Sequence, residues 1–134
     1  MIVVDTNIIH YCWVRGQHTE IAQAVRRQDP DWHAPVLWRS ELRNVLTAYL
    51  RRRLLSRVQI GGILRAADQA MADGEHLVAD DLVLEVVAGS TLTAYDAEFV
   101  ALASALAVPL VTADKAVLKA FPEQAVTMEA FLGK

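Results

Sequence analysis

Two short apolar runs constrain the fold of this chain most, because each one leads directly into polar residues. Residues 2–7 read IVVDTN, and residues 108–114 read VPLVTAD. Short apolar runs of this kind are typical of strands that are buried on both faces, as in a parallel sheet. Stretches with helical spacing lie between them, so strands and helices alternate along the chain. This pattern predicts an α/β fold, and right-handed crossovers would make it a three-layer α/β/α sandwich with a central parallel sheet.

Helical spacing and stop signals place the other elements. Ser56 is expected to cap a helix that runs to about Ala72, and Pro35 is expected near the first turn of a long helix from about Val36 to Arg53. The remaining expected helices cover 7–16, 18–28, 81–88, 95–106, 114–121 and 128–132, and the remaining strands lie in 31–38, 76–79 and 125–127. No repeat or Gly/Ser-rich linker divides the chain, so residues 1–134 are expected to form a single domain.

The composition excludes several classes of protein. Cys12 is the only cysteine, so neither an intramolecular disulfide nor a thiolate zinc cluster can form. The N-terminus has no basic region before its apolar residues, and no apolar run approaches the roughly 20 residues that span a bilayer. We therefore expect a soluble protein of the reducing cytoplasm, without a membrane partner.

Positive charge is concentrated in one stretch, although the formal net charge of the whole chain is -3. Residues 39–65 contain seven arginines and a single acid, Glu41. Two interpretations remain open from charge alone. The arginines form a solvated helix face whose alkyl stems cover apolar surface, or they bind the phosphates of a nucleic acid.

Three aspartates stand where predicted strands end or predicted helices begin. Asp5 ends the first strand, Asp114 ends the strand in 108–114, and Asp96 begins the helix before that strand. Because the carboxyl ends of parallel strands meet at one edge of the sheet, Asp5 and Asp114 are expected to point into the same crevice. Each aspartate, taken singly, also fits the role of an N-cap that satisfies a free N–H of the first helical turn.

Glu41 does not fit the capping explanation, because it lies inside the long predicted helix. Helical spacing puts it on the side of Trp38 and Val45, toward the apolar face. A lone carboxylate there is costly unless it is protonated or meets a positive partner. A metal ion would remove this cost, and the alternative is a boundary position from which Glu41 reaches water.

The available side chains indicate which metal would suit such a site. The four histidines form no pair at helical spacing, so the sequence has no zinc pattern. Carboxylates, hydroxyls and amides are oxygen ligands, which suit Mg²⁺ or Mn²⁺. Several acids without a histidine are typical of sites where such ions act on a phosphate ester, with a metal-activated water as nucleophile. This is nuclease chemistry, and the arginine-rich stretch would attract the substrate beside it.

Four segments resemble, in their expected order, the motifs of the PIN-domain family of ribonucleases. They are VVDTNII, SELRN, AYDAEFVALA and VPLVTADKAVLKAFP, and the resemblance is closest to the VapC-type toxins of toxin-antitoxin pairs. It covers nearly the whole chain. The resemblance implies a PIN-like α/β/α sandwich and an endoribonuclease that depends on Mg²⁺ or Mn²⁺.

The resemblance also implies the residues of the site. The catalytic and metal-binding acids would be Asp5, Glu41, Asp96 and Asp114. Polar residues beside these acids are expected to support them, namely Thr6, Asn7, Asn44 and Thr112. Some relatives carry a further acid where this chain has Phe99, and the neighbouring Glu98 would be turned about 100° away on the helix. Arg39 and Arg43 are hypothetical RNA contacts.

Related toxins are held inactive by a small antitoxin protein that covers the acidic cleft, and they commonly self-associate. We therefore expect an RNA substrate, a cognate antitoxin and a homo-oligomer, most simply a dimer. Two other phosphate-handling classes fit poorly, because receiver domains need adjacent acids and Asp-x-Asp phosphatases need an acid at position 7, which is Asn7. A non-catalytic PIN-like module that binds RNA or protein, and a DNA-directed nuclease, remain as alternatives.

Overall fold

The computed structural model describes residues 1–134 and contains one five-stranded sheet whose paired strands all run parallel. The strand order is β3-β2-β1-β4-β5. The strands are β1 (Ile2–Val4), β2 (Trp32–Pro35), β3 (Glu75–His76), β4 (Leu110–Val111) and β5 (Ala125–Val126). The expected parallel α/β architecture is confirmed.

Strand β1 lies at the centre of the sheet and is buried on both faces. Val3 is opposite His33 of β2 on one side and opposite Leu110 of β4 on the other. Neighbours on both sides explain why Ile2–Val4 is an uninterrupted apolar run rather than an alternating one. Because β1 and β4 are adjacent and parallel, the residues that follow them are held at the same edge of the sheet.

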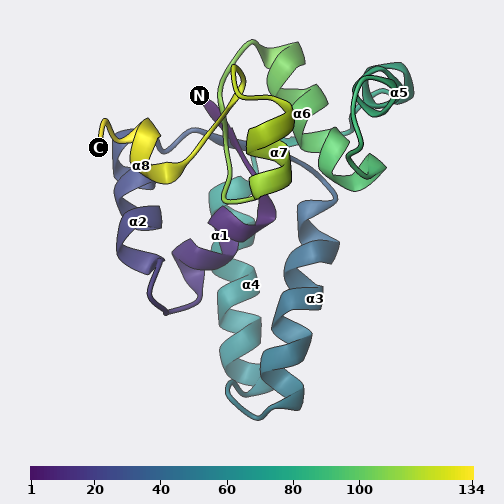
Figure 1. The fold of residues 1–134 in the computed structure, drawn as a ribbon. Coiled ribbons are helices and arrows are strands. Elements are labelled where there is room, and N and C mark those ends of the chain that lie inside the picture. The colour runs from purple at the N-terminus through teal and green to yellow at the C-terminus, as the bar shows by residue number, and fades with distance from the viewer.

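Eight helices surround the sheet or extend from it (Figure 1). They are α1 (Thr6–Trp13), α2 (Thr19–Gln28), α3 (Trp38–Arg51), α4 (Arg57–Met71), α5 (Asp80–Ala88), α6 (Ala94–Leu106), α7 (Lys115–Ala120) and α8 (Met128–Phe131). The chain moves outward from β1 to β2 and β3, and then crosses back to β4 and β5. Right-handed crossovers put α1 to α4 on one face and α5 and α6 on the other, which gives the three layers.

Helices α3 and α4 form a long hairpin that projects from the body of the molecule (Figure 1). The expected cap of α4 is confirmed, because Ser56 and Gln59 each bind the other's backbone N–H in a capping box. The turn of this hairpin exposes Arg51, Arg52 and Arg53. Several arginines of the positively charged stretch 39–65 therefore lie at the far end of the α3–α4 hairpin.

Two expected boundaries are wrong by a few residues. Pro35 is the last residue of β2, opposite His76, and α3 begins only at Trp38. The backbone N–H of Val36 donates to the His76 carbonyl and continues the hydrogen bonding between β2 and β3. Pro35 itself has no N–H and cannot donate to the sheet. Strand β3 ends at His76, and Leu77 lies outside the sheet with 88% of its surface exposed.

Gly74 precedes β3 because the backbones approach closely there. A Cβ atom at this position would overlap the carbonyl oxygen of Trp32. The Gly74 carbonyl in turn accepts a hydrogen bond from the N–H of Ala34. None of the eight helices has the length and apolar character needed to cross a membrane.

Candidate active site

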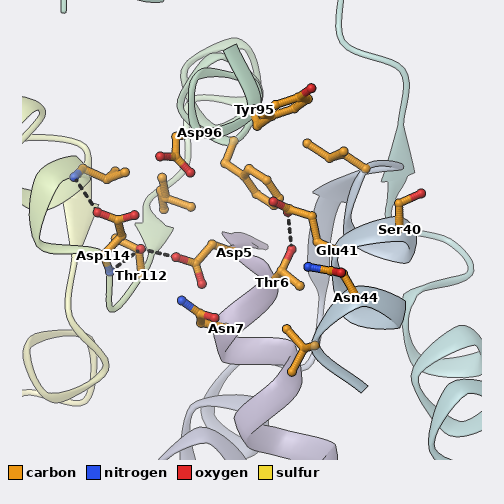
Figure 2. A pocket seen from close by; sticks show the side chains of 15 residues that line it. Asp5, Thr6, Asn7, Ser40, Glu41, Asn44, Tyr95, Asp96, Thr112 and Asp114 are labelled. Carbon is orange, nitrogen blue, oxygen red and sulfur yellow. Dashed lines mark hydrogen bonds between the residues drawn. The ribbon is translucent and has the colours of Figure 1, made fainter. Parts of the chain in front are cut away.

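A pocket of about 380 Å³ opens where β1 and β4 end (Figure 2). Strand ends supply one side of it, and residues of α1, α3, α6 and α7 supply the rest. All four predicted acids line it: Asp5, Glu41, Asp96 and Asp114. The four predicted polar neighbours also line it: Thr6, Asn7, Asn44 and Thr112. The structure thus brings together residues that are up to 109 positions apart in the sequence.

Asp5 is fixed from two sides. One carboxylate oxygen accepts a hydrogen bond from the backbone N–H of Ile8 at 3.2 Å, so Asp5 is the N-cap of α1. The other oxygen accepts a hydrogen bond from the hydroxyl of Thr112, which follows β4. Thr112 is almost completely buried, and its Oγ1 also accepts from the backbone N–H of Asp114 at 3.0 Å. Thr112 therefore links the ends of the two central strands.

Asp114 is also an N-cap. One of its oxygens, Oδ1, accepts from the backbone N–H groups of Ala116 and Val117 at 2.8 and 3.2 Å. This bonding begins α7 and points the carboxylate along the pocket wall (Figure 2). Capping and pocket lining, which the sequence offered as alternatives for these aspartates, thus occur together in Asp5 and Asp114. The second oxygen of Asp114 accepts no hydrogen bond from the protein.

Asp96 differs from the other two aspartates, because it lies in the first turn of its helix as expected but is not the N-cap. Helix α6 begins two residues earlier with Ala94, and Thr93 is its N-cap. The Thr93 hydroxyl accepts from the backbone N–H of Asp96 at 3.1 Å. Because Thr93 provides the cap, the carboxylate of Asp96 is not needed for the helix and faces the pocket (Figure 2).

Glu41 forms the opposite wall of the pocket, one turn into α3. Its Oε1 accepts a hydrogen bond from the Thr6 hydroxyl at 2.6 Å. The partner is therefore a neutral hydroxyl rather than a cation. Asn44 lies one helical turn further along α3, lines the same pocket and is exposed, without a hydrogen bond to Glu41.

Burial and mutual repulsion shift the protonation of these acids. Burial raises the pKa of Asp5 from its ordinary 3.8 to about 6, against the hydrogen bonds from Thr112 and Ile8, and the charge of Asp114 adds to the rise. Burial also raises the pKa of Glu41, with a contribution from Asp96. The pKa of Asp96 is raised by burial and then by Asp114. Each shift has the sign expected of carboxylates that lack a positive partner.

No lysine, arginine or histidine lines the pocket. Its polar atoms are carboxylate, hydroxyl and amide groups, which fit a hard cation such as Mg²⁺ or Mn²⁺. No three His, Cys, Asp or Glu side chains converge closely enough to hold one ion among them. This arrangement fits an ion that takes one or two carboxylates and keeps several of its waters, as Mg²⁺ does.

Arg39 and Arg43 lie outside the pocket. On α3 each is two residues, or about 200°, from Glu41, so they project from the other side of the helix. The Arg39 guanidinium donates two hydrogen bonds of 2.6 Å to Glu75 and is also paired with Asp68. Arg43 is exposed and lies with Arg65 in a depression between α3 and α4.

Seven lining residues were not selected by sequence reasoning, and three of them bear on the chemistry of the site: Ser40, Tyr95 and Phe99. Ser40 precedes Glu41 and Tyr95 precedes Asp96, and both line the pocket. Phe99 lines it as a buried side chain, whereas Glu98 does not line it, as its position on the helix predicted. The useful signal for Tyr95 is its exposure of 63%, which is a property of the fold and not of the sequence.

The fold and the pocket define an α/β protein with an acidic site at the carboxyl ends of its two central strands. Residues 2–123 match the family model described as PIN domain. The chain therefore belongs to the PIN domain family, in agreement with the four motifs. By sequence alone, no curated protein matches it.

Solved structures share this fold over nearly the whole chain. PAE2754 from Pyrobaculum aerophilum aligns with a TM-score of 0.71 and 21% identity, over 98% of this chain and 93% of that one. FitAcB from Neisseria gonorrhoeae aligns with a TM-score of 0.72 and 19% identity, over 96% and 98% of the two chains. A toxin-antitoxin complex from Klebsiella pneumoniae aligns with a TM-score of 0.67 and 20% identity, over 96% of this chain and 98% of that one. At these identities the likeness concerns the fold.

Proposed function

We propose that this PIN-domain protein is an endoribonuclease that depends on Mg²⁺ or Mn²⁺ and acts as the toxin of a toxin-antitoxin pair. One observation carries the proposal: four carboxylates line one pocket without any cationic side chain. Such a set of charges is unfavourable for the isolated protein, since burial and repulsion raise the pKa of Asp5, Glu41 and Asp96. A site that costs stability in this way is typical of function rather than of folding.

The four acids, Asp5, Glu41, Asp96 and Asp114, would hold the ion directly or through water. Bound there, Mg²⁺ or Mn²⁺ supplies Lewis-acid chemistry, which lowers the pKa of water and offsets the negative charge of a phosphodiester. The protein's own part is to fix the acids before substrate arrives. Thr112 and the start of α1 hold Asp5, and the Thr6 hydroxyl holds Glu41. Supported carboxylates of this kind keep their geometry without reorganisation during the reaction.

Asn7 and Asn44 complete the set of polar side chains in the pocket. Asn7 lies in the first turn of α1 beside Asp5 and Thr6, where its amide would hydrogen-bond water or a phosphate oxygen. The exposed arginines of the α3–α4 hairpin would attract RNA phosphates, and one of them, Arg43, lies two residues from Glu41 in the sequence. Arg39 would have to leave Glu75 to take part, so we assign RNA contact to Arg43 before Arg39.

The toxin assignment rests on the family motifs and on relatives of the same fold. The Klebsiella pneumoniae structure, which shares the fold, is named as a toxin-antitoxin complex. We propose that a cognate antitoxin covers the acidic pocket of this chain. We also propose that the chain forms a dimer, for which the exposed leucines Leu77, Leu82 and Leu84 offer apolar surface. Light scattering on the purified chain tests the dimer.

A cleavage assay on antitoxin-free protein tests the nuclease proposal. Structured RNAs and DNA of the same sequences are incubated with the wild type in Mg²⁺ or Mn²⁺, and in EDTA. The variant Asp5→Asn removes one pocket charge, and Asp81→Asn removes a charge from the exposed start of α5 as the matched control. We expect RNA cleavage that EDTA abolishes, that Asp5→Asn lowers by roughly two orders of magnitude or more, and that Asp81→Asn leaves unchanged.

Other outcomes support the alternatives. Cleavage of DNA in preference to RNA would identify a DNA-directed nuclease with the same metal chemistry. A folded protein that binds Mn²⁺ and RNA but cleaves neither nucleic acid would be a non-catalytic PIN-like module. Cleavage that survives both EDTA and Asp5→Asn would refute the proposed site.

A further inference from the structure

Tyr95 is a large aromatic side chain at the rim of the acidic pocket. It is the second residue of α6, 63% of its surface is exposed, and it is not among the apolar side chains packed against the core. Its hydroxyl makes no hydrogen bond within the protein. In Figure 2 the ring lies on the Glu41 side of the pocket, away from Asp114. The fold gains little from this ring, which leaves its face free for a ligand.

Two polar side chains on α3 lie on the same side of the pocket. Ser40 and Asn44 are four residues apart, so they share one face of the helix, on either side of Glu41 in the sequence. Both are exposed, both line the pocket, and neither forms a side-chain hydrogen bond within the protein. A hydroxyl and an amide together offer donors and acceptors to a neighbouring polar edge.

The two sides of the pocket thus have different chemistry. The side of Asp5, Asp96 and Asp114 is anionic, and it repels any negative group that lacks a counter-ion. The side of Tyr95, Ser40 and Asn44 is aromatic and neutral, apart from Glu41, whose Oε1 is occupied by Thr6. A flat, uncharged ring with a hydrogen-bonding edge fits the second side, and a further phosphate does not.

We propose that Tyr95, Ser40 and Asn44 form a subsite for one unpaired nucleobase of the RNA beside the scissile phosphodiester. This inference rests on the proposed function, since it concerns the substrate of the same pocket. Tyr95 supplies the stacking face, and Ser40 and Asn44 supply hydrogen bonds that discriminate among base edges. Stacking on an aromatic side chain with contacts to the base edge is how proteins recognise single-stranded RNA. The base must be unpaired to enter, so the cleavage site lies in a loop or single strand.

A fluorescence experiment tests the stacking without relying on cleavage. RNA pentamers that each carry 2-aminopurine at one of the five positions are titrated with Asp5→Asn protein in Mg²⁺, so that the RNA stays intact. We expect quenching for at least one position, because stacking on an aromatic ring quenches this base. Tyr95→Phe should keep the quenching, and Tyr95→Ala should abolish it. Gln23→Ala, a truncation of an exposed side chain on α2, is the matched control and should keep it.

The base-edge contacts are tested with a random RNA pool and sequencing of the cleaved ends. Asn44→Ala and Ser40→Ala should each change the base preference at one position next to the cut. An unchanged preference in both variants, or quenching that is absent in every pentamer or survives in Tyr95→Ala, overturns the subsite.

The two proposals fail in different ways. Wild-type cleavage without stacking would leave the nuclease intact and remove the subsite. Stacking without cleavage would keep the subsite and remove the nuclease.

Discussion

The charge of Asp5 should make the metal-free protein less stable as the pH rises. Burial raises the pKa of this carboxyl from 3.8 to about 6 in the folded protein, whereas the unfolded chain has the ordinary value. The folded state therefore binds the proton more tightly than the unfolded state. Proton binding to Asp5 therefore stabilises the folded state by its full amount below pH 3.8, and this stabilisation is lost as the pH rises through about 6.

The size of the effect follows from the two pKa values. At roughly 1.4 kcal/mol per pH unit between them, a charged Asp5 costs the folded state about 3 kcal/mol at pH 7.5. Only about 0.5 kcal/mol of this cost remains at pH 4, so the pH-dependent part is about 2.5 kcal/mol. Asp5→Asn removes the titration, although the amide loses one acceptor for Ile8 or Thr112, a loss of about 1 kcal/mol that does not vary with pH.

Urea unfolding in EDTA, followed by the fluorescence of the buried Trp32 and Trp38, measures this difference. The free energy of unfolding of Asp5→Asn minus that of the wild type should increase by about 2.5 kcal/mol between pH 4 and pH 7.5. Asp81→Asn is the control, and its difference from the wild type should stay flat. A flat difference for Asp5→Asn as well would refute the reasoning that Asp5 is buried as an unpaired charge.

Four other positions give direct predictions. Arg39→Ala should lower the free energy of unfolding by about 1 kcal/mol, because the pair with Glu75 is lost, and should leave RNA affinity unchanged. Arg43→Ala should weaken RNA binding and reduce the slope of log K against log salt concentration by about 1. Equal effects of the two variants on RNA binding would contradict this assignment. Ser56→Ala should cost about 1 kcal/mol in urea unfolding through the capping box of α4, with an unchanged cleavage rate. Gly74→Ala should cost about 2 kcal/mol or more, because a methyl group collides with the Trp32 carbonyl, and a variant of wild-type melting temperature would show that the backbone there can move.

The sheet and the acids could be predicted from sequence because their signals are local. The apolar runs before Asp5 and Asp114 predict buried strands, and parallel pairing then brings their carboxyl ends together. Glu41 stands out because helical spacing places this charged residue on the apolar side of its helix, and the family motifs link it to the aspartates. These residues line one pocket as predicted, although their catalytic roles remain proposals.

Other features depend on contacts between distant residues and have no local signal. Thr6 donates to Glu41 across 35 positions, and Arg39 is paired with Glu75 across 36. Charge alone left Arg39 open between a structural and an RNA-binding role, and the ion pair with Glu75 favours the structural one. The exposure of Tyr95 likewise depends on how α6 sits on the sheet. The short strand β3 was placed slightly late because only two of its residues pair.

The central claim is that the carboxylates of this pocket act in catalysis and are more than helix caps. Asp114→Asn tests it most directly, because asparagine caps a helix as well as aspartate does but carries no charge. The measurement is the Mg²⁺-dependent cleavage rate of an end-labelled RNA by wild type and variant, with melting temperatures to confirm equal folding. We predict that the rate falls by roughly two orders of magnitude or more, while the stability is no lower than that of the wild type because repulsion with Asp5 and Asp96 is relieved. A variant that cleaves at the wild-type rate would show that Asp114 serves only α7, and the account would be wrong.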